Sequence, residues 1–277
     1  MRFLVCIGLV VAAVPAMAAP LVFERIHISE RTYESAAAFD VNHDGVMDIY
    51  SGAYWYEGPD FKKDHKVCNL EPIDTYYDDF SNYPMDVNGD GYLDIVTGGW
   101  FGKSMSWREN PKGQPVEWIT HKIFETGNVE RPVFHDLDGD GLVEVLPVPK
   151  PLYVFKLQRD EKGLGKGAFD ISTIECGPGG HGLGAGDVNG DGKVDIVEPD
   201  GWCEAPAGAF TVEGWTWRPE FKLGSASVPI LVFDVNEDGM NDLIVGEAHN
   251  YGLYWMEQGK DNDGNRTWTR HDIETTC

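Results

Sequence analysis

Basic residues, cysteines and long apolar runs are all scarce in this chain of 277 residues. Lys and Arg together number 22 against 46 Asp and Glu, so the net charge is −24. A surface of that charge repels nucleic acid and anionic lipid, and we therefore expect no nucleic-acid partner. The longest apolar run, Phe3 to Val14, is too short to span a bilayer comfortably, so we expect no membrane insertion of the mature chain.

The first residues have the layout of a secretory signal peptide. Arg2 supplies the positive charge, Phe3 to Val14 form the apolar segment, and Ala16-Met17-Ala18 offers a cleavage site of small residues. The sequence therefore predicts a signal peptide over residues 1–18 and a secreted or periplasmic mature protein. The alternative is an uncleaved anchor.

Four of the five cysteines follow the predicted cleavage site. Four cysteines in a chain of this length do not make a disulfide scaffold, and their wide spacing excludes a zinc-knuckle pattern. An oxidising compartment allows disulfides, but the sequence leaves their pairing open. The four cysteines are Cys68, Cys176, Cys203 and Cys277.

The acidic residues recur in one frame of nine residues, found five times. Hydrophobic residues make up 42% of the chain and aromatics 12%, which excludes an acidic disordered chain. The frame is Asp-x-Asn-x-Asp-Gly-x-x-Asp, with small departures. We number the segments as loops 1 to 5: Asp40–Asp48, Asp86–Asp94, Asp136–Glu144, Asp187–Asp195 and Asp234–Asp242.

This frame has the chemistry of a calcium loop. Oxygens at positions one, three and five can wrap around one Ca²⁺, the glycine at position six permits a sharp turn, and a carboxylate at position nine closes the shell. We expect up to five Ca²⁺, with loop 3 (Glu144 at position nine) and loop 5 (Glu237 at position four) as the weaker sites. The predicted ligands are Asp40, Asn42, Asp44, Asp48, Asp86, Asn88, Asp90, Asp94, Asp136, Asp138, Asp140, Glu144, Asp187, Asn189, Asp191, Asp195, Asp234, Asn236, Asp238 and Asp242.

Short strands surround each loop. A β-branched run follows every loop, turns recur about every ten residues, and no amphipathic helix of ordinary length appears. Four antiparallel strands in each unit of about 40–50 residues predict an all-β fold, a β-propeller with five visible repeats. We expect the propeller over residues 19–277, with blades over residues 29–74, 75–126, 127–176, 177–223 and 224–277.

The repeated loops resemble the FG-GAP or VCBS-type repeats of integrin α-subunit propellers and of many secreted bacterial proteins. The resemblance covers nearly the whole mature chain. It implies that each loop joins the first and second strands of a blade on the lower face. It also implies that the opposite face, here called the top face, carries ligands.

Closure of the ring has two alternatives. Residues 21–28 read as an outer strand that closes a ring, yet the fifth repeat has its own outer strand over residues 267–273. Similar bacterial proteins look seven-bladed, so we favour a chain that is part of a longer ring over a five-bladed ring with a spare strand. An open ring exposes strand edges and favours self-association.

Residues just after the second strands, or just before the first, should line the top face. Aromatic rings beside carboxylates and amides suit a carbohydrate, because sugar C–H faces stack on rings while hydroxyls meet polar oxygens. We therefore predict a module that binds carbohydrate or protein. The candidate ligand-binding residues are Tyr54, Asp79, Trp100, Lys150, Trp202 and Glu204.

An enzyme is the alternative. His181 and His249 belong to neighbouring repeats, and two imidazoles with a nearby carboxylate can hold Zn²⁺ or another transition metal. This arrangement is similar to the propeller domain of aldos-2-ulose dehydratase. The likeness implies a metal-assisted lyase or isomerase acting on a keto-sugar, with His181, His249 and Asp200 as catalytic residues. The sequence leaves open whether the chain is an enzyme.

Overall fold

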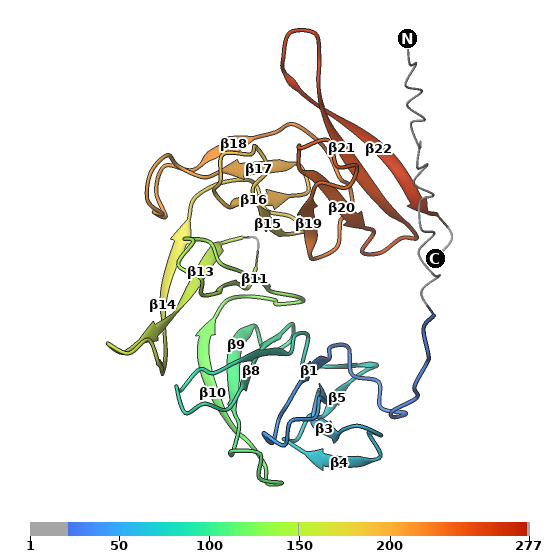
Figure 1. Cartoon of the computed structure of the whole chain (residues 1–277), viewed down its shortest axis with the longest axis vertical. Helices are drawn as coiled ribbons and strands as arrows, with labels where there is room; N and C mark the ends of the chain where they lie inside the picture. Colours follow the sequence, from blue (N-terminus) through green and yellow to red (C-terminus); the bar gives the residue numbers. More distant parts are fainter. Residues whose placement is uncertain (1–21, 149, 276–277) are drawn as a thin grey trace, which may run out of the picture. The chain divides into compact units, whose positions relative to one another are not determined.

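A computed structural model describes residues 22–148 and 150–275, and every regular element in these residues is a β-strand (Figure 1). Residues from Arg31 onward form one compact unit, and residues 22–30 do not belong to it. The predicted signal peptide lies outside the described residues.

Twenty strands form five four-stranded antiparallel blades, each with its strands in sequence order. Blade 1 has β1 (Ala37–Phe39), β2 (Asp48–Ser51), β3 (Tyr54–Glu57) and β4 (Lys63–Lys66). Blade 2 has β7 (Tyr83–Met85), β8 (Asp94–Gly99), β9 (Ser104–Glu109) and β10 (Ile119–Glu125). Blade 3 has β11 (Val133–His135), β12 (Glu144–Leu146), β13 (Leu152–Arg159) and β14 (Gly165–Ile174). Blade 4 has β15 (Gly184–Gly186), β16 (Asp195–Glu198), β17 (Gly201–Glu204) and β18 (Thr216–Arg218). Blade 5 has β19 (Ile230–Phe233), β20 (Asp242–Gly246), β21 (Leu253–Lys260) and β22 (Arg266–Glu274).

A short hairpin, β5 (Pro72–Ile73) and β6 (Tyr76–Tyr77), lies between blades 1 and 2. The predicted all-β propeller of four-stranded blades is confirmed. Residues of the segments that carry the inner strands of all five blades, such as Tyr83, Phe134 and Ala185, line one cavity of about 630 Å³.

Each hydrophobic cluster of the propeller is shared by two successive blades. One cluster joins Met105 and Val96 of blade 2 to Phe155 of blade 3, and the others join blades 1 and 2, 3 and 4, and 4 and 5 in the same way. The middle strands are apolar because both of their faces are covered, and β8, β12 and β16 are buried along their whole length. The blades therefore depend on their neighbours for their cores.

Blades 4 and 5 also pair directly, through parallel strands β15 and β19. A side chain on Gly184 would place its Cβ 2.2 Å from the carbonyl oxygen of Ile230, so only glycine allows this approach. The glycines of β15 are thus a requirement of the contact between blades.

A buried charged pair joins blades 1 and 2. Arg108 donates to the carboxylate of Asp79 (3.0 Å) and to the hydroxyl of Tyr50 (3.0 Å), and Thr97 donates to the same carboxylate (2.6 Å). The sequence prediction that Asp79 binds a ligand is therefore wrong. Asp79 is fully buried, and its carboxylate oxygens already accept hydrogen bonds from Arg108, Thr97 and Asn82 of its own blade.

Residues 22–28, which belong to the predicted closing strand, have no strand pairing in the described chain. An outer strand of this kind needs the free edge of a third strand. Each third strand in the described chain is already paired with an outer strand of its own blade.

One disulfide, Cys176–Cys203, links the end of blade 3 to β17 of blade 4. Cys68 is a free, half-buried cysteine, and burial raises the pKa of its thiol. Cys277 lies outside the described residues.

Candidate functional site

The five acidic loops share one hydrogen-bonded backbone form. At position one of loop 4, Asp187 accepts the amide hydrogens of Asp191 (3.1 Å) and Gly192 (2.8 Å). The side-chain oxygens at positions three and five accept amides two residues further along the chain. The other four loops repeat these bonds. The loop's own amides therefore hold the side-chain oxygens of positions one, three and five on the inside of each loop.

The glycine at position six is required by the backbone. In all five loops its φ lies between 84° and 91°, a region that other residues rarely adopt. Position four is also left-handed, and it is a non-glycine residue only at His43 (φ 60°) and Glu237 (φ 62°). Glu237, which the sequence suggested as a weakness of loop 5, leaves the backbone form unchanged.

The acid at position nine is buried in every loop. In loop 4, one oxygen of Asp195 accepts the amide of Val188 and the other accepts the amide of Ala205, both at 2.9 Å. Loops 1, 2 and 5 have the same pair of bonds. Burial raises the pKa of Asp195 and Asp94 to about 7 each, against the opposing effect of the amides. A bound cation would favour the ionised form.

The loops also touch the next blade. The carbonyl oxygen of Val41, at position two of loop 1, accepts a hydrogen bond from the side chain of Asn110 in blade 2 (3.0 Å). Val87 accepts one from the amide of Gly167 in blade 3 (2.8 Å), and Val188 one from Gln258 in blade 5 (2.9 Å). A loop with a fixed backbone therefore also fixes a hydrogen bond between two neighbouring blades.

A glutamate flanks the loop in blade 4, where Glu204 accepts from Asn189 at position three (3.2 Å) and pairs with Arg218 (2.5 Å). Asn189 lies within the loop, which leads into the start of the second strand at Asp195. The predicted place of Glu204 on the top face is therefore wrong, because the third strand carries it back to the loop.

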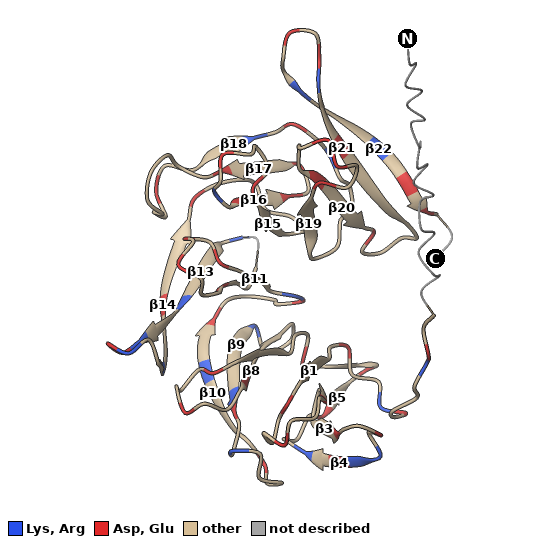
Figure 2. Ribbon diagram, viewed as in Figure 1, with Lys and Arg blue, Asp and Glu red and all other residues tan. Residues whose placement is uncertain are grey.

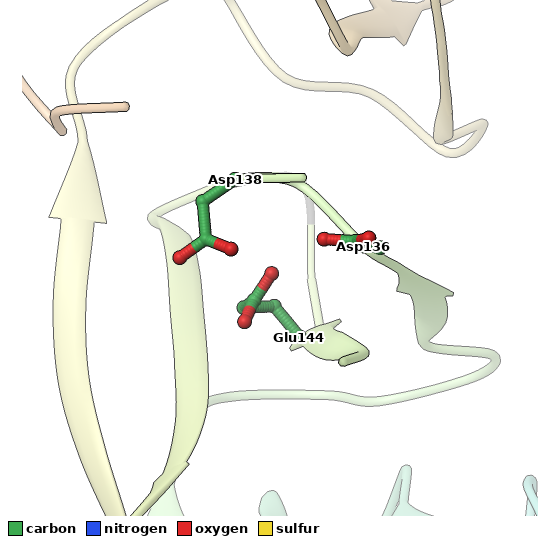
Figure 3. A group of neighbouring side chains, drawn as sticks. All are labelled: Asp136, Asp138 and Glu144. Carbon is green, nitrogen blue, oxygen red and sulfur yellow. The ribbon is translucent and has the colours of Figure 1, made fainter. Parts of the chain in front are cut away.

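Loop 3 differs from the other four. The carboxylates of Asp136, Asp138 and Glu144 lie close together and point toward one another (Figure 3). The ammonium group of Lys156 contacts Asp138, lies 2.7 Å from Asp140 and lies 3.4 Å from Glu144. The hydrogen bond from Lys156 lowers the pKa of Asp140. Three of the four ligand positions of this loop therefore already face a cation.

The donor sets of loops 1, 4 and 5 fit Ca²⁺. Each offers three carboxylates and one amide oxygen, and in the described chain no basic side chain forms an ion pair with any of them. Loop 2 has the same set, with one distant contact between Lys112 and Asp90 (3.6 Å). Figure 2 shows that acidic residues recur in the turns of all the blades, and that basic residues include some on the outer strands β4, β10 and β22.

On the top face, at the other end of the second strands, a hollow of about 400 Å³ is lined by Trp100, Lys150 and His181 among others. The rings of His181 and His249 are 4.9 Å apart between centroids. Nε2 of His181 lies 2.7 Å from a carboxylate oxygen of Glu130, and its Nδ1 lies 3.2 Å from the carbonyl oxygen of Ala226. The structure thus brings together four of the predicted residues, which are Trp100, Lys150, His181 and His249.

Three other predicted residues lie elsewhere. Trp202 is only 1% exposed and packs in the core between blades 4 and 5, so the prediction that it binds a ligand is wrong. Asp200 lines a separate hollow with Trp217, and neither histidine lines that hollow. Tyr54 is half-buried, and the guanidinium of Arg31 covers its ring at 3.7 Å.

Sequence reasoning missed Glu198, at the top end of β16. It is fully buried, one of its oxygens accepts the amide of Gly179 (2.8 Å), and burial raises its pKa to about 6. Its other oxygen has no hydrogen-bond partner in the described chain. The available signal was a glutamate that ends the otherwise apolar run Ile196-Val197.

Comparison with known proteins agrees with this geometry. Residues 53–146, which include loops 2 and 3, match the family model of the FG-GAP-like repeat. The propeller therefore contains FG-GAP-type repeats, as the sequence indicated, and such repeats support a propeller-type binding module. No curated protein matches the chain. The described residues contain no apolar helix of membrane-spanning length.

We predict that position nine stabilises the fold without metal, whereas position five matters only when a cation is bound. In EDTA, Asp195→Ala should lower the free energy of unfolding by about 1–3 kcal/mol for each of the two buried amides that lose their acceptor. Asp191→Ala, in the exposed part of the same loop, should cost less than about 1 kcal/mol because water replaces the lost bond. Urea denaturation of both variants tests this, and equal losses would contradict it.

Proposed function

We propose that this chain is an exported calcium-binding propeller whose top face binds a carbohydrate. The observation that carries the proposal is the separation of two features along the second strands β8 and β12. An inward-facing acidic loop lies at one end, and the hollow beside Trp100 lies at the other. Export is supported by the predicted signal peptide and by the disulfide, since disulfides persist in oxidising compartments.

Calcium binding is supported by charge and geometry together. Each loop gathers at least three carboxylates, and the buried acid at position nine has no counter-ion in loops 1, 2, 4 and 5 among the described residues. A dication would reduce the repulsion among these acids and would hold the loop against the next blade. Calcium accepts such oxygen-rich, flexible sites.

Carbohydrate binding is supported by exposed rings beside the hollow. Trp100 is 39% exposed and lines the hollow, and its neighbour Phe101 lies 6.4 Å from Tyr76, ring to ring. These aromatic surfaces suit stacking on sugar C–H faces, and Lys150 and Glu130 supply polar groups for hydroxyls. A protein ligand is the other occupant that suits a propeller of FG-GAP-type repeats.

The second candidate is a metal-assisted lyase or isomerase. The close approach of His181, His249 and Glu130 favours it. However, both ring nitrogens of His181 already have partners, so a metal would have to replace Glu130 or Ala226 there. The likeness to aldos-2-ulose dehydratase stays a prediction.

We expect excess EDTA to lower the melting temperature by roughly 10 °C or more. Each site filled at about 100 times its dissociation constant contributes about 2.7 kcal/mol, and 1 kcal/mol shifts the melting of a domain of this size by roughly 2–4 °C. Calorimetry with EDTA, followed by re-addition of Ca²⁺ or Mg²⁺, tests this. Calcium should restore the original melt. A melt that chelation leaves unchanged would sink the calcium proposal.

Trp100→Ala should weaken binding to a polysaccharide about tenfold, because one lost aromatic stacking contact amounts to about 1.4 kcal/mol. Affinity electrophoresis on a panel of neutral and acidic polysaccharides measures this. Phe233→Ala, which removes an exposed ring beside loop 5, is the control and should bind as the parent does. Equal binding by Trp100→Ala and the parent would contradict the proposed face.

Elemental analysis separates the two candidate functions. Protein purified without added transition metal should contain no stoichiometric zinc, manganese or iron if the top face only binds a ligand. About one such ion per chain, lost in His181→Ala, would favour the enzyme instead.

A further inference from the structure

The third strand of each blade places one residue next to the acidic loop, and strand register identifies it. The residue after position nine pairs with Tyr56 in blade 1, Arg108 in blade 2, Phe155 in blade 3, Cys203 in blade 4 and Met256 in blade 5. The next residue along each third strand is therefore equivalent in all five blades. These residues are Glu57, Glu109, Lys156, Glu204 and Glu257.

In four blades this flanking residue is an acid, and in blades 2, 4 and 5 it reaches the loop itself. Glu204 and Glu257 each accept a hydrogen bond at 3.2 Å from the asparagine at position three of their loops, and Glu109 lies 3.5 Å from Asn88. A fourth carboxylate beside three others raises the attraction of the loop for a dication, and in blade 4 Arg218 offsets part of this charge.

Blade 3 reverses the sign at this position. Lys156 reaches into loop 3 and meets positions three, five and nine, which are Asp138, Asp140 and Glu144. Position three is also an aspartate here, whereas it is asparagine in the other four loops. Loop 3 has thus gained one carboxylate and one ammonium group, as expected for an internal ion cluster.

Position nine of loop 3 is also adapted to the lysine. In the other loops both oxygens of this acid accept backbone amides. In loop 3 one oxygen of Glu144 accepts the amide of Leu137 (2.9 Å), and the other faces the ammonium group of Lys156 instead. Glu144 is one methylene longer than aspartate, and its carboxylate is 1% exposed, so the lysine is its counter-ion.

Proximity of a lysine alone does not produce this arrangement. Lys112 lies near loop 2, but it contacts a single carboxylate, Asp90, at 3.6 Å, and its side chain is 60% exposed. Lys156 contacts three carboxylates from within its own blade and is 40% exposed. Because it is tethered, its ammonium group competes with free cations at a high effective concentration.

We propose that the ammonium group of Lys156 takes the place of calcium in loop 3, so that the chain binds four Ca²⁺ and blade 3 is held by an internal cation. This inference rests on the proposed calcium binding of loops 1, 2, 4 and 5. It means that the loop with the most carboxylates is the one that takes no metal.

Calcium stoichiometry of chelator-stripped protein, measured by equilibrium dialysis at concentrations that saturate the parent, tests the inference. The parent should bind four ions, and Lys156→Glu, which restores the flanking acid of the other blades, should bind five. Lys112→Glu is the matched control and should stay at four. Five ions in the parent, or four in Lys156→Glu, would overturn the inference. No calcium in any of these proteins would instead contradict the calcium proposal itself.

A second pair of variants keeps the test valid if Lys156→Glu folds poorly. Asp140→Asn and Asp90→Asn make the same change at position five of loops 3 and 2. Asp140→Asn should leave the parent's stoichiometry unchanged, whereas Asp90→Asn should lose one ion. Loss of one ion in Asp140→Asn would show that loop 3 binds calcium and would overturn the inference.

Discussion

A buried carboxylate at position nine organises each blade. In loops 1, 2, 4 and 5 it accepts one amide from position two of the loop and another from a residue in or directly after the third strand. It therefore ties together the end of the first strand, the start of the second and the far end of the third. The same burial that makes these bonds specific makes its negative charge costly, and it raises the pKa of Asp94 and Asp195 to about 7. A cation inside the loop relieves this cost.

The loops also explain why the blades need one another. Every hydrophobic cluster spans two blades, and the carbonyls of Val41, Val87 and Val188 accept hydrogen bonds from the blade that follows. A cation bound in a loop, as proposed, would hold these carbonyls in place. In blade 3 the ammonium group of Lys156 supplies the positive charge inside the loop. The contact of blade 3 with blade 4 also contains a disulfide. In the proposed function, the loop end of each second strand stabilises the fold and the opposite end binds the ligand.

The sequence predicted what depends on short-range repetition, and it failed where neighbouring blades decide burial. The five loops, their glycines and the four-stranded blades follow from spacing and residue type alone. Asp79 and Trp202 have the residue types of a binding face, but Arg108 and the core between blades 4 and 5 cover them. Glu204 follows the second strand closely in the sequence, but the register of the third strand places it beside the loop. Lys156 stands outside its loop in the sequence, and only the pairing of β12 with β13 shows that it is equivalent to a glutamate.

Hydrogen exchange of the loop amides, with and without calcium, tests most directly the claim that bound cations hold the blades together. The account predicts that chelation increases exchange in loops 1, 2, 4 and 5 and in the segments of the next blade that contact them, such as Asn110 and Gln258. Loop 3 should keep the same protection in both conditions, because Lys156 remains in place. Uniform exchange in all five loops, unaffected by calcium, would contradict the account.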